Sequence, residues 1–419
     1  MGKRVVVVGA GIVGVSAAIW LQRDGHAVTL IDRLAPGEGT SYGNGGVLAA
    51  SGVLPVPMPG IVAKGPHMLL DPRQPLFMKW RYLPRLAPWL VRYLAHANTN
   101  DVARRVNAIV PLVGDSLADH QALSAGTDAA RWLVPSDYLY LYKDRAAFER
   151  DRTDWAIRES HGFIWDVLEG AALQDYEPHF GDANQFAAKL EGHGRISDPG
   201  RYVKDLARHL EKSGGTVMQA TVDGFAQQAG KLTGVRAGGT TIACDNAVLT
   251  TGAWSGPLAK QLGLDVPMES ERGYHLELIE PSTMPRAPVM VSSGKFVITP
   301  MEGRIRLAGI VEFGGLEAPA SHAPFKLLEQ NIRSAMPQLT WKETAKWMGH
   351  RPAMVDSLPM IGPVPSVDGV FVGFGHDHLG LTAGPKTGRL LAQQISGQHP
   401  NIDMTPYAPA RFTRVANAA

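Results

Sequence analysis

Three glycines and an aspartate near the start of the chain have the types and spacing of a dinucleotide-binding site. Gly9, Gly11 and Gly14 stand in a Gly-x-Gly-x-x-Gly pattern, and Asp32 ends the next apolar run. In this pattern the first glycine permits a tight turn, the second lets the backbone approach a pyrophosphate, and the third lets a helix pack closely on a strand. A carboxylate at the position of Asp32 can hold ribose hydroxyls. We therefore expect the chain to bind a dinucleotide.

The residues around these glycines predict the elements that hold them in place. The β-branched run at residues 5–8 is typical of a parallel strand buried on both faces. A helix over residues 13–23 would aim its N-terminal N–H groups and its dipole at the pyrophosphate, and residues 27–31 supply the next strand. A second strand, glycine turn and helix occupies residues 370–396. We therefore expect two helix N-termini to meet at one ligand.

The composition excludes several classes of protein. The 419 residues include 41 lysines and arginines against 39 acidic residues, and this near-neutral balance argues against nucleic acid as a partner. Cys244 is the only cysteine, which excludes an internal disulfide and a cysteine-based metal or iron–sulfur site, and we predict no metal. A single cysteine also suits a reducing compartment. We expect a cytoplasmic protein, with the inner face of a membrane as one place where it could act.

A glycine-rich polar loop at residues 39–46 follows the nucleotide-binding unit. Its small residues can present backbone N–H groups to a phosphate or a flat ring, and its position favours this reading over that of a flexible connection. The apolar residues 247–254 predict a buried strand that ends in a glycine. Between residues 267 and 341 the pattern changes to short strands with few helices, which predicts a second domain built on an antiparallel sheet.

Together these segments resemble the D-amino-acid oxidase superfamily of FAD-dependent oxidoreductases, and most of all its bacterial D-amino-acid dehydrogenase branch. The matching pieces follow one another along nearly the whole chain: the run from Gly9 to Asp32, Thr40-Ser41-Tyr42-x-Asn44-x-Gly46, Ser197-Asp198-Pro199, Thr251-Gly252-Ala253-Trp254-Ser255, Arg272-Gly273-Tyr274, Arg351-Pro352, and Gly375-His376-x-x-x-Gly380-x-Thr382.

The resemblance implies an α/β fold, α+β overall. It consists of a glutathione-reductase-type FAD-binding Rossmann domain and a substrate domain with a large, mostly antiparallel sheet. By this resemblance the FAD-binding domain takes residues 1–75, 195–258 and 345–419. The substrate domain takes residues 76–194 and 259–344.

The resemblance also implies which residues contact FAD, held without a covalent bond because Cys244 is in the wrong place for attachment. The glycines of the first motif would face the pyrophosphate, Asp32 the adenosine ribose, and the backbone of Val222 the adenine. The turn that begins at Gly375 would place N–H donors at the flavin N1–C2=O edge, where negative charge develops on reduction. The full expected set is Gly9, Gly11, Gly14, Asp32, Arg33, Ser41, Asn44, Gly45, Gly46, Val47, Val222, Gly252, Trp254, Gly375, His376, Gly380, Leu381 and Thr382.

The reaction implied by the resemblance is hydride transfer from the Cα atom of an amine substrate to flavin N5, which gives an imine that water hydrolyses. Such a site needs a cation for the substrate carboxylate. Relatives often place an arginine after the strand that corresponds to residues 297–300, but this chain has Met301 there. We expect Arg351 and Tyr274 to take this role, and the remaining candidates are Arg272, Arg304 and Arg306.

His378 is the third residue that we expect to act in catalysis. The family usually has small residues after the position of His376, whereas this chain has Asp377 and His378. An imidazole beside the flavin can bind substrate or accept a proton. The alternative, to which we give equal weight, is a histidine at the surface or behind the site. His275 is a weaker candidate of the same kind.

Met301 in place of an arginine predicts an apolar pocket wall. This favours a D-amino acid or a cyclic imino acid, such as D-proline or cis-4-hydroxy-D-proline, as the substrate. Electrons would pass to a quinone or another acceptor, and the alternative is an oxygen-using amine oxidase of the glycine or sarcosine type. An NAD-dependent dehydrogenase would leave the unit at residues 373–396 unexplained. A flavin-binding subunit that needs a partner protein is a further alternative.

The basic and aromatic stretch at residues 73–93 contains no acidic residue and has two interpretations. The first is peripheral contact with an anionic membrane surface. The second, which we favour, is a pair of short surface helices that are broken at Pro84 and Pro88 and pack their aromatic side chains inward.

Overall fold

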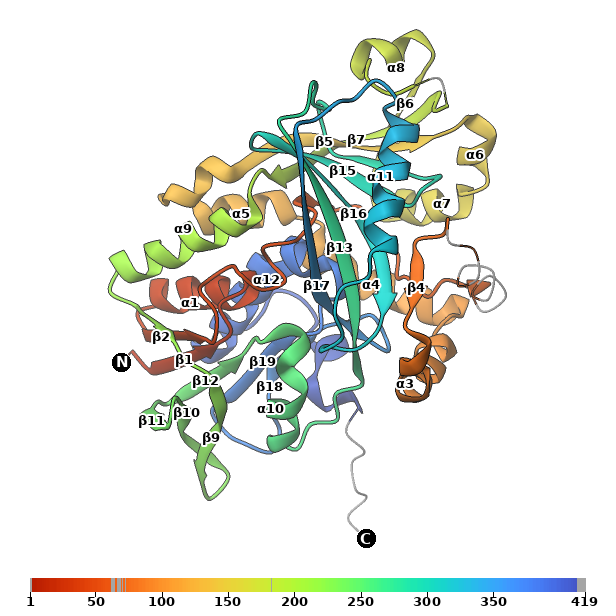
Figure 1. Ribbon diagram of the computed structural model, residues 1–419. Coiled ribbons are helices and arrows are strands. Elements are labelled where there is room, and N and C mark those ends of the chain that lie inside the picture. The colour runs from red at the N-terminus through yellow and green to blue at the C-terminus, as the bar shows by residue number, and fades with distance from the viewer. Residues whose placement is uncertain are drawn as a thin grey trace.

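The computed structural model describes residues 2–61, 65, 69, 71, 73–181 and 183–412, and two large sheets organise the chain (Figure 1). The first is six-stranded, with the order β18-β19-β12-β1-β2-β8. Strand β18 is antiparallel to β19, and the other neighbours are parallel. The strands are β1 (Arg4–Val8), β2 (Ala27–Asp32), β8 (Thr216–Gln219), β12 (Asn246–Leu249), β18 (Met360–Pro363) and β19 (Val370–Phe374).

Both faces of the six-stranded sheet are covered, as the valine run of β1 predicts. Val5 and Val7 pack under helices on one face, whereas Val6 and Val8 face the other layer. The helices are α1 (Ile12–Arg23), α4 (Thr99–Val113), α5 (Ser116–Ser124), α9 (Pro199–Lys212) and α12 (Gly380–Ile395). The opposite layer is a small antiparallel sheet with α10 (Ser255–Gln261), and its strands are β9 (Val222–Gln228), β10 (Lys231–Ala237) and β11 (Thr240–Ala243).

Helices α1 and α12 come from opposite ends of the chain and lie against each other (Figure 1). Two glycines of α12 make this approach possible. A Cβ atom on Gly388 would lie 2.5 Å from the backbone nitrogen of Ala17, and one on Gly384 would lie 2.9 Å from Ile12 Cγ1. Because contacts under 3.0 Å are essentially absent between real side chains, larger residues at these positions would push the helices apart.

The second sheet has ten strands, and its main path runs β17-β13-β16-β15-β14-β5-β7-β3. Strand β4 pairs with β16 and strand β6 pairs with β7. All pairings are antiparallel except those of β14 with β5 and of β4 with β16. The strands are β3 (Val47–Leu48), β4 (Leu76–Met78), β5 (Leu133–Tyr142), β6 (Asp166–Glu169), β7 (Phe186–Ile196), β13 (Met268–Ile279), β14 (Val289–Val291), β15 (Phe296–Met301), β16 (Arg304–Phe313) and β17 (Glu343–Met354).

The alternation of side chains along β13 decides which residues can reach a ligand. Tyr274, Leu276 and Leu278 pack into a core with helix α11 (Ala323–Ala335) on one face of the large sheet. Residues of the opposite parity, such as Glu271 and Gly273, face the other side. The fold is therefore the predicted combination of a Rossmann-type sheet and a large, mostly antiparallel sheet. The expected domain boundary at residue 345 falls inside β17, which pairs with β13 along its whole length.

The basic and aromatic stretch contains one 3-10 turn (Trp80–Tyr82) and one continuous α-helix, and it is not broken at Pro84 and Pro88 as the sequence predicted. After β4, helix α3 (Leu83–Ala95) runs without interruption, with Pro84 in its first turn and Pro88 inside it. A proline near a helix start costs little, because the first N–H groups have no intrahelical partner. Trp89 and Tyr93 are buried, as expected, whereas Trp80 is 57% exposed. Within the described ranges, no helix is long and apolar enough to cross a membrane.

The charged composition of residues 145–160 predicts a single helix, and the structure differs from this. These residues form two short helices, α6 (Arg145–Glu149) and α7 (Arg152–Ser160), and α8 (Ala171–Tyr176) follows nearby in the chain. The Asp144 carboxylate caps α6 by accepting a hydrogen bond from the backbone nitrogen of Ala147.

The contact between α1 and α12 gives a test of the fold. We expect Gly388→Ala to lower the free energy of unfolding by about 1–3 kcal/mol or more, because the new methyl group overlaps the backbone of Ala17. Gly256→Ala in α10 is the matched control, since nothing lies within 4 Å of its Cβ position. Thermal unfolding followed by circular dichroism should show a lower midpoint for Gly388→Ala alone. Equal midpoints for both variants would contradict the close packing.

Candidate active site

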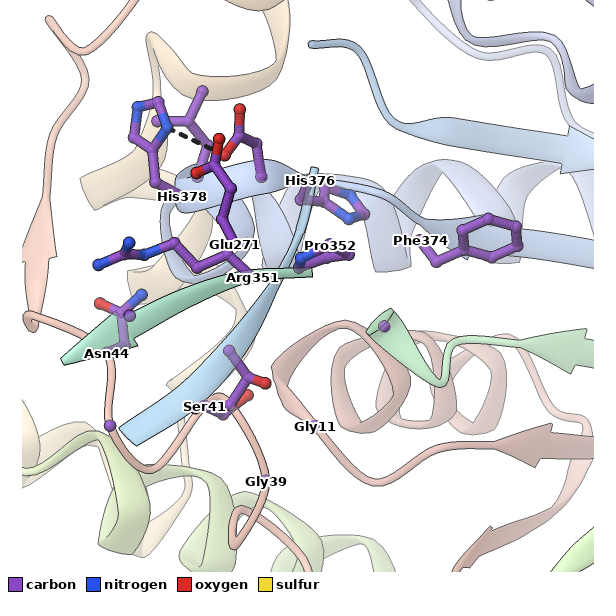
Figure 2. Close-up of a pocket in the computed structure, with 18 of the residues that line it drawn as sticks. Gly11, Gly39, Ser41, Asn44, Glu271, Arg351, Pro352, Phe374, His376 and His378 are labelled. Atoms are coloured by element: carbon purple, nitrogen blue, oxygen red, sulfur yellow. Dashed lines mark ion pairs between the residues drawn. The ribbon is translucent and has the colours of Figure 1, made fainter. Parts of the chain in front are cut away.

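A cavity of about 1240 Å³ lies between the two large sheets. Its wall includes the carboxyl ends of β1 and β2 and the faces of β13, β16 and β17 that point away from α11. One end is lined by Asp32, Arg33, Val222 and Trp254. The other end is lined by charged residues from the large sheet and from the turn before α12, and Figure 2 shows part of this wall.

The first glycine motif forms the predicted cradle at the N-terminus of α1. Gly9 has φ +108, and its nitrogen donates to the carbonyl of Ile31 at 2.7 Å. A Cβ atom on Gly14 would lie 1.8 Å from the Gly9 carbonyl oxygen, so the turn closes only without a side chain there. Gly11 lies in the cavity wall, and the Ser41 hydroxyl accepts a hydrogen bond from the Ile12 nitrogen at 3.0 Å. This bond holds the glycine-rich loop against the start of α1.

Four of the glycines expected to contact FAD shape the backbone without lining the cavity. Gly9, Gly46 and Gly375 have φ values of +108, +75 and +85, which side chains rarely tolerate. Gly14 provides room for the turn before α1. The structure brings the other expected FAD residues into the cavity wall: Gly11, Asp32, Arg33, Ser41, Asn44, Gly45, Val47, Val222, Gly252, Trp254, His376, Gly380, Leu381 and Thr382.

Asp32 holds its own loop as well as facing the cavity. Its Oδ2 atom accepts a hydrogen bond from the Ala10 nitrogen at 2.7 Å, and its Oδ1 atom accepts one from the Leu34 nitrogen at 3.0 Å. A carboxylate has about four acceptor positions, so capacity remains for ribose hydroxyls. Beside it, the guanidinium of Arg33 stacks 4.5 Å from the ring centre of Trp254. These residues form a platform at the expected adenosine end.

The N-terminus of α12 reaches the same cavity through Gly380, Leu381 and Thr382. Helix α5 fixes this turn, because the Ser116 hydroxyl donates to the Thr382 carbonyl at 2.8 Å and His120 Nε2 bonds the Leu381 carbonyl at 2.9 Å. His376 is buried, and its Nε2 atom lies 2.9 Å from the Thr387 hydroxyl. Burial lowers the pKa of His376 to about 4, so this imidazole is neutral near pH 7.

Arg351 differs from the other arginines that the sequence offered for a substrate carboxylate. Arg272 pairs with Glu312 at 2.7 Å. Arg304 and Arg306 both pair with Glu277 at 2.7 Å, and Arg304 also reaches Asp198. Arg351 lines the cavity over Gly273, and among the described residues no carboxylate lies within ion-pair distance of it. Its guanidinium is therefore available to an anion.

Tyr274 and Met301 are placed differently from Arg351. The Tyr274 hydroxyl donates to Glu312 Oε2 at 2.6 Å and accepts from the Ser321 nitrogen, so it is bound in a network on the α11 side of the sheet. Tyr274 still forms part of the cavity lining, but Glu312 and Ser321 hold its hydroxyl. Met301 is buried against Gly46, whose Cβ position lies 2.7 Å from Met301 Cε. The apolar wall of the cavity therefore comes from other residues, which lie on α3, β4 and β16.

His378 joins Arg351 at one end of the cavity, and Figure 2 shows both side chains there with Glu271. The His378 side chain is 40% exposed, and its Nδ1 atom lies 3.5 Å from Oδ1 of the buried Asp377. Burial, and then the charge of Asp377, raise the pKa of Glu271 well above its usual value. Burial alone would also raise the pKa of Asp377, but the neighbouring His378 and Arg351 lower it.

Sequence reasoning missed Glu271, Asp377 and Tyr93 as site residues. Asp377 lies between His376 and His378, at the position where the chain departs from the family pattern. The sequence signal is an aspartate in a glycine-rich turn, because aspartate tolerates left-handed backbone better than most side chains. In the structure Asp377 has φ +52. Glu271 and Tyr93 gave no such signal, because neither lies in a motif and only the tertiary structure turns them into the cavity.

The residues present fit an FAD molecule. The cavity is continuous from the Arg33–Trp254 platform, past the cradle of Gly11 and Ser41, to the N-terminus of α12. A Cβ atom on Gly14 would close the cradle. The first N–H groups of two helices, which have no partner within their own helix, suit the negative charges of a pyrophosphate and of a reduced flavin. FAD would be held by these residues without a covalent bond, since Cys244 is buried in the core beyond the cavity wall.

Comparison with known proteins gives the same assignment. A family model described as "FAD dependent oxidoreductase" (DAO) matches residues 4–394 of this chain. The chain belongs to this family. This chain is 37% identical to a protein named "D-amino-acid oxidase" from Bradyrhizobium diazoefficiens. The match covers 98% of this chain and 99% of that protein. This chain is also 30% identical over 99% of its length to a "D-amino acid dehydrogenase" from Xanthobacter autotrophicus, covered in full (100%).

A solved structure shows the same fold at lower identity. The L-proline dehydrogenase from P. horikoshii superimposes with a TM-score of 0.75 and 18% identity, over 99% of this DAO-family chain and 98% of that one. At that identity the likeness shows the fold alone. The protein is an FAD-dependent oxidoreductase, as predicted. The residues that line its cavity determine which substrate fits.

We expect the purified protein to be yellow and to release its flavin completely on precipitation with trichloroacetic acid. The physical reason is that the one cysteine lies outside the cavity, so hydrogen bonds and packing alone hold the cofactor. Flavin absorbance should appear in the supernatant and not in the pellet. A yellow pellet after washing would contradict non-covalent binding.

We expect the stability of the protein to fall as the pH drops below 6.5. Burial lowers the pKa values of His120 and His376 to about 4, whereas in the unfolded chain they titrate near 6.5. Between these values only the unfolded state takes up the protons, so stability is fully present above pH 6.5 and is lost toward pH 4. Each histidine contributes on the order of 1.4 kcal/mol per pH unit.

Thermal unfolding midpoints measured from pH 7 to pH 4.5 test this expectation. His120→Gln, which removes one of the two groups, should give a shallower decline than the unchanged protein. Midpoints that stay constant or rise on acidification would contradict it.

Proposed function

We propose that this DAO-family enzyme oxidises the Cα–N bond of a D-amino acid or a cyclic imino acid. FAD held by the cavity residues would supply a hydride acceptor at N5 for the Cα hydrogen and its electron pair, and water would hydrolyse the imine product. The names of the two relatives support a D-amino acid as the substrate class. The residues of the chain contribute binding, orientation and the exclusion of water.

The observation that carries this proposal is the guanidinium of Arg351, which has no carboxylate partner in the described chain and makes one long hydrogen bond, 3.4 Å, to the Ile310 carbonyl. An arginine without a carboxylate partner at one end of a mostly apolar cavity is a site for a small carboxylate, which the guanidinium can bind through two N–H groups. Buried ion pairs hold Arg272, Arg304 and Arg306, so these side chains are not available for this role. Arg351 would thus fix the carboxylate and orient Cα beside it.

The apolar part of the cavity supports a substrate with an apolar body. Leu86, Leu90 and Leu94 of α3 and Val311 and Phe313 of β16 line this part and belong to one apolar cluster. Such a wall would accept the ring of D-proline, or of cis-4-hydroxy-D-proline with its hydroxyl directed away from the wall. It would also accept an aliphatic side chain. The support for an imino acid therefore comes from α3 and β16, because Met301 lies elsewhere.

The electron acceptor is a second part of the proposal. We favour a quinone or another carrier. Val56 and Trp80 line the cavity and are 46% and 57% exposed, and Val91, on the same helix as the apolar wall, is 70% exposed. Basic residues such as Arg81 and Arg85 lie beside them, which would suit peripheral contact with an anionic membrane inside the cell. The alternative is oxygen, as in glycine- or sarcosine-type oxidases, and one relative's name ("D-amino-acid oxidase") favours it.

Arg351→Ala should raise KM for the substrate by about 30-fold or more, because removing one partner of a desolvated charge pair costs about 2–5 kcal/mol. Arg351→Lys should recover part of the loss, since it restores the charge without the paired N–H groups. Arg333→Ala is the control: this exposed arginine pairs with Glu329 outside the cavity. Steady-state kinetics with an unchanged KM for Arg351→Ala would overturn the assignment of the carboxylate site.

Anaerobic bleaching of the flavin should identify the substrate class. D-proline, cis-4-hydroxy-D-proline and D-alanine, with their L-enantiomers, N-methyl amino acids and glycine, form the panel. We expect the D-enantiomers to reduce the flavin and the cyclic compounds to reduce it fastest. Bleaching by D-alanine but not by D-proline or its analogue would rule out the imino-acid preference. Bleaching by glycine or sarcosine alone would favour the alternative.

Reoxidation of the reduced enzyme should separate the two classes of acceptor. Stopped-flow mixing with a soluble quinone should restore the flavin absorbance faster than mixing with air-saturated buffer. Sedimentation with vesicles containing phosphatidylglycerol, compared with neutral vesicles, tests the membrane contact at residues 73–93. Reoxidation that is faster in air would favour the oxidase.

A further inference from the structure

The end of the cavity that holds Arg351 also contains a buried acidic pair. Glu271 comes from β13 and Asp377 from the turn before α12, and their side chains are both at least nine-tenths buried. Two carboxylates in contact in a buried site cannot both be ionised, so the pair carries one negative charge and retains one proton. The raised pKa of Glu271 and the lowered pKa of Asp377 assign the proton to Glu271 and the charge to Asp377.

The buried Asp377 carboxylate lacks hydrogen-bond donors within the described chain. Neither of its oxygens has a hydrogen-bond partner among the described side chains and backbone. The proton on Glu271 can satisfy one oxygen, and His378 Nδ1 remains 3.5 Å from Oδ1. A buried carboxylate with so few donors costs free energy, and native proteins retain such a group where a ligand completes it.

The backbone of Asp377 adds a second sign of function. Its φ of +52 lies in the left-handed region, which asparagine and aspartate tolerate better than other side chains but which still carries strain. Glycine would fit this turn without strain. The chain therefore keeps a carboxylate in a conformation that disfavours it, at a position in the cavity wall.

Opposite charges lie near each other in this part of the cavity. Arg351 of β17 carries the positive charge and Asp377 the negative one. The charge of Arg351 favours the ionised form of Asp377 and of Glu271, whereas the charge of Asp377 disfavours ionisation of Glu271. The other polar groups that face Asp377 are Glu271, His378 and Tyr93 of α3, whose hydroxyl also has no hydrogen-bond partner in the described chain. An amino acid carries the complementary pattern, a carboxylate and an amino group on adjacent atoms.

We propose that Asp377, held ionised by the proton on Glu271, binds the amino group of the substrate while Arg351 binds its carboxylate. This inference rests on the proposed function and adds the group that selects an amino or imino acid over a carboxylic acid of the same shape. Asp377 accepts hydrogen bonds from the substrate N–H groups in either protonation state of the nitrogen. Glu271 acts through Asp377 and is a positioning residue.

The experiment compares two ligands that differ only by the amine. D-proline and cyclopentanecarboxylate have five-membered rings that carry a carboxylate, and D-alanine and propionate are the corresponding open-chain pair. The holoenzyme gives the Kd of the amino acids from the concentration dependence of anaerobic flavin bleaching. It gives the Kd of the carboxylic acids from the perturbation of the flavin spectrum.

We expect Asp377→Asn to weaken the binding of the amino acids without weakening that of the carboxylic acids. The amino acids should bind about 10- to 100-fold more weakly, because a hydrogen bond to a charged group is lost. The carboxylic acids should bind as tightly or more tightly, because a negative charge near their carboxylate has gone. Asp377→Gly removes the carboxylate as well and suits φ +52, so it should fold and give the same pattern.

Variants of Glu271 test its positioning role. Glu271→Gln retains a donor for Asp377 and should preserve more of the preference for amino acids than Glu271→Leu does. Glu177→Gln is the matched control, since Glu177 is buried but lies outside the cavity, and it should leave both affinities unchanged.

A parallel weakening of amino acids and carboxylic acids in both Asp377 variants would overturn the proposal, because a structural role affects every ligand. Unchanged affinities would overturn it too. If no amino or imino acid bleaches the flavin of the unchanged enzyme, the proposed function fails separately. The amine site is then tested by spectral titration of D-proline against cyclopentanecarboxylate, where the same weakening of D-proline alone supports it and parallel shifts overturn it.

Discussion

The close approach of α1 and α12 is the constraint on which the rest of the site depends. Gly388 and Gly384 leave no side chain between the helices, so an element from the start of the chain and one from its end share one layer. Their N-termini then open on the same cavity. Each brings backbone N–H groups that have no partner within the helix and the positive end of a helix dipole. A long anionic cofactor can therefore be held at two distant points by backbone groups alone.

Ion pairs divide the charged residues of the large sheet into two groups. Arg304 and Arg306 converge on Glu277, and Arg272 meets Glu312, with side chains that are largely or fully buried. Removing one member of such a pair would leave a buried charge without compensation, so these residues fix the sheet. Arg351 and Asp377 lie outside these pairs and face the cavity. The sheet is thus held by its own ion pairs, and two opposite charges remain for a ligand.

Strand parity explains why some expected residues reach the cavity and others do not. Arg272 and Tyr274 belong to one face of β13, where both meet Glu312, and Glu271 and Gly273 belong to the other, although part of Tyr274 still borders the cavity. A motif such as Arg272-Gly273-Tyr274 names three neighbours in sequence that lie on two faces of a sheet. The sequence predicts Met301 in the pocket wall, but this side chain at the end of β15 packs against Gly46.

The sequence by itself determined the nucleotide-binding half of the protein. The valine run, the spacing of Gly9, Gly11 and Gly14, and the turn before α12 act through local backbone geometry, which neighbouring residues encode. Only the tertiary structure decided the substrate end. Glu271, Arg351 and Asp377 come from three separate elements, and their charges depend on burial and on one another. No local pattern records such long-range contacts, because pairing across strands and between layers sets them.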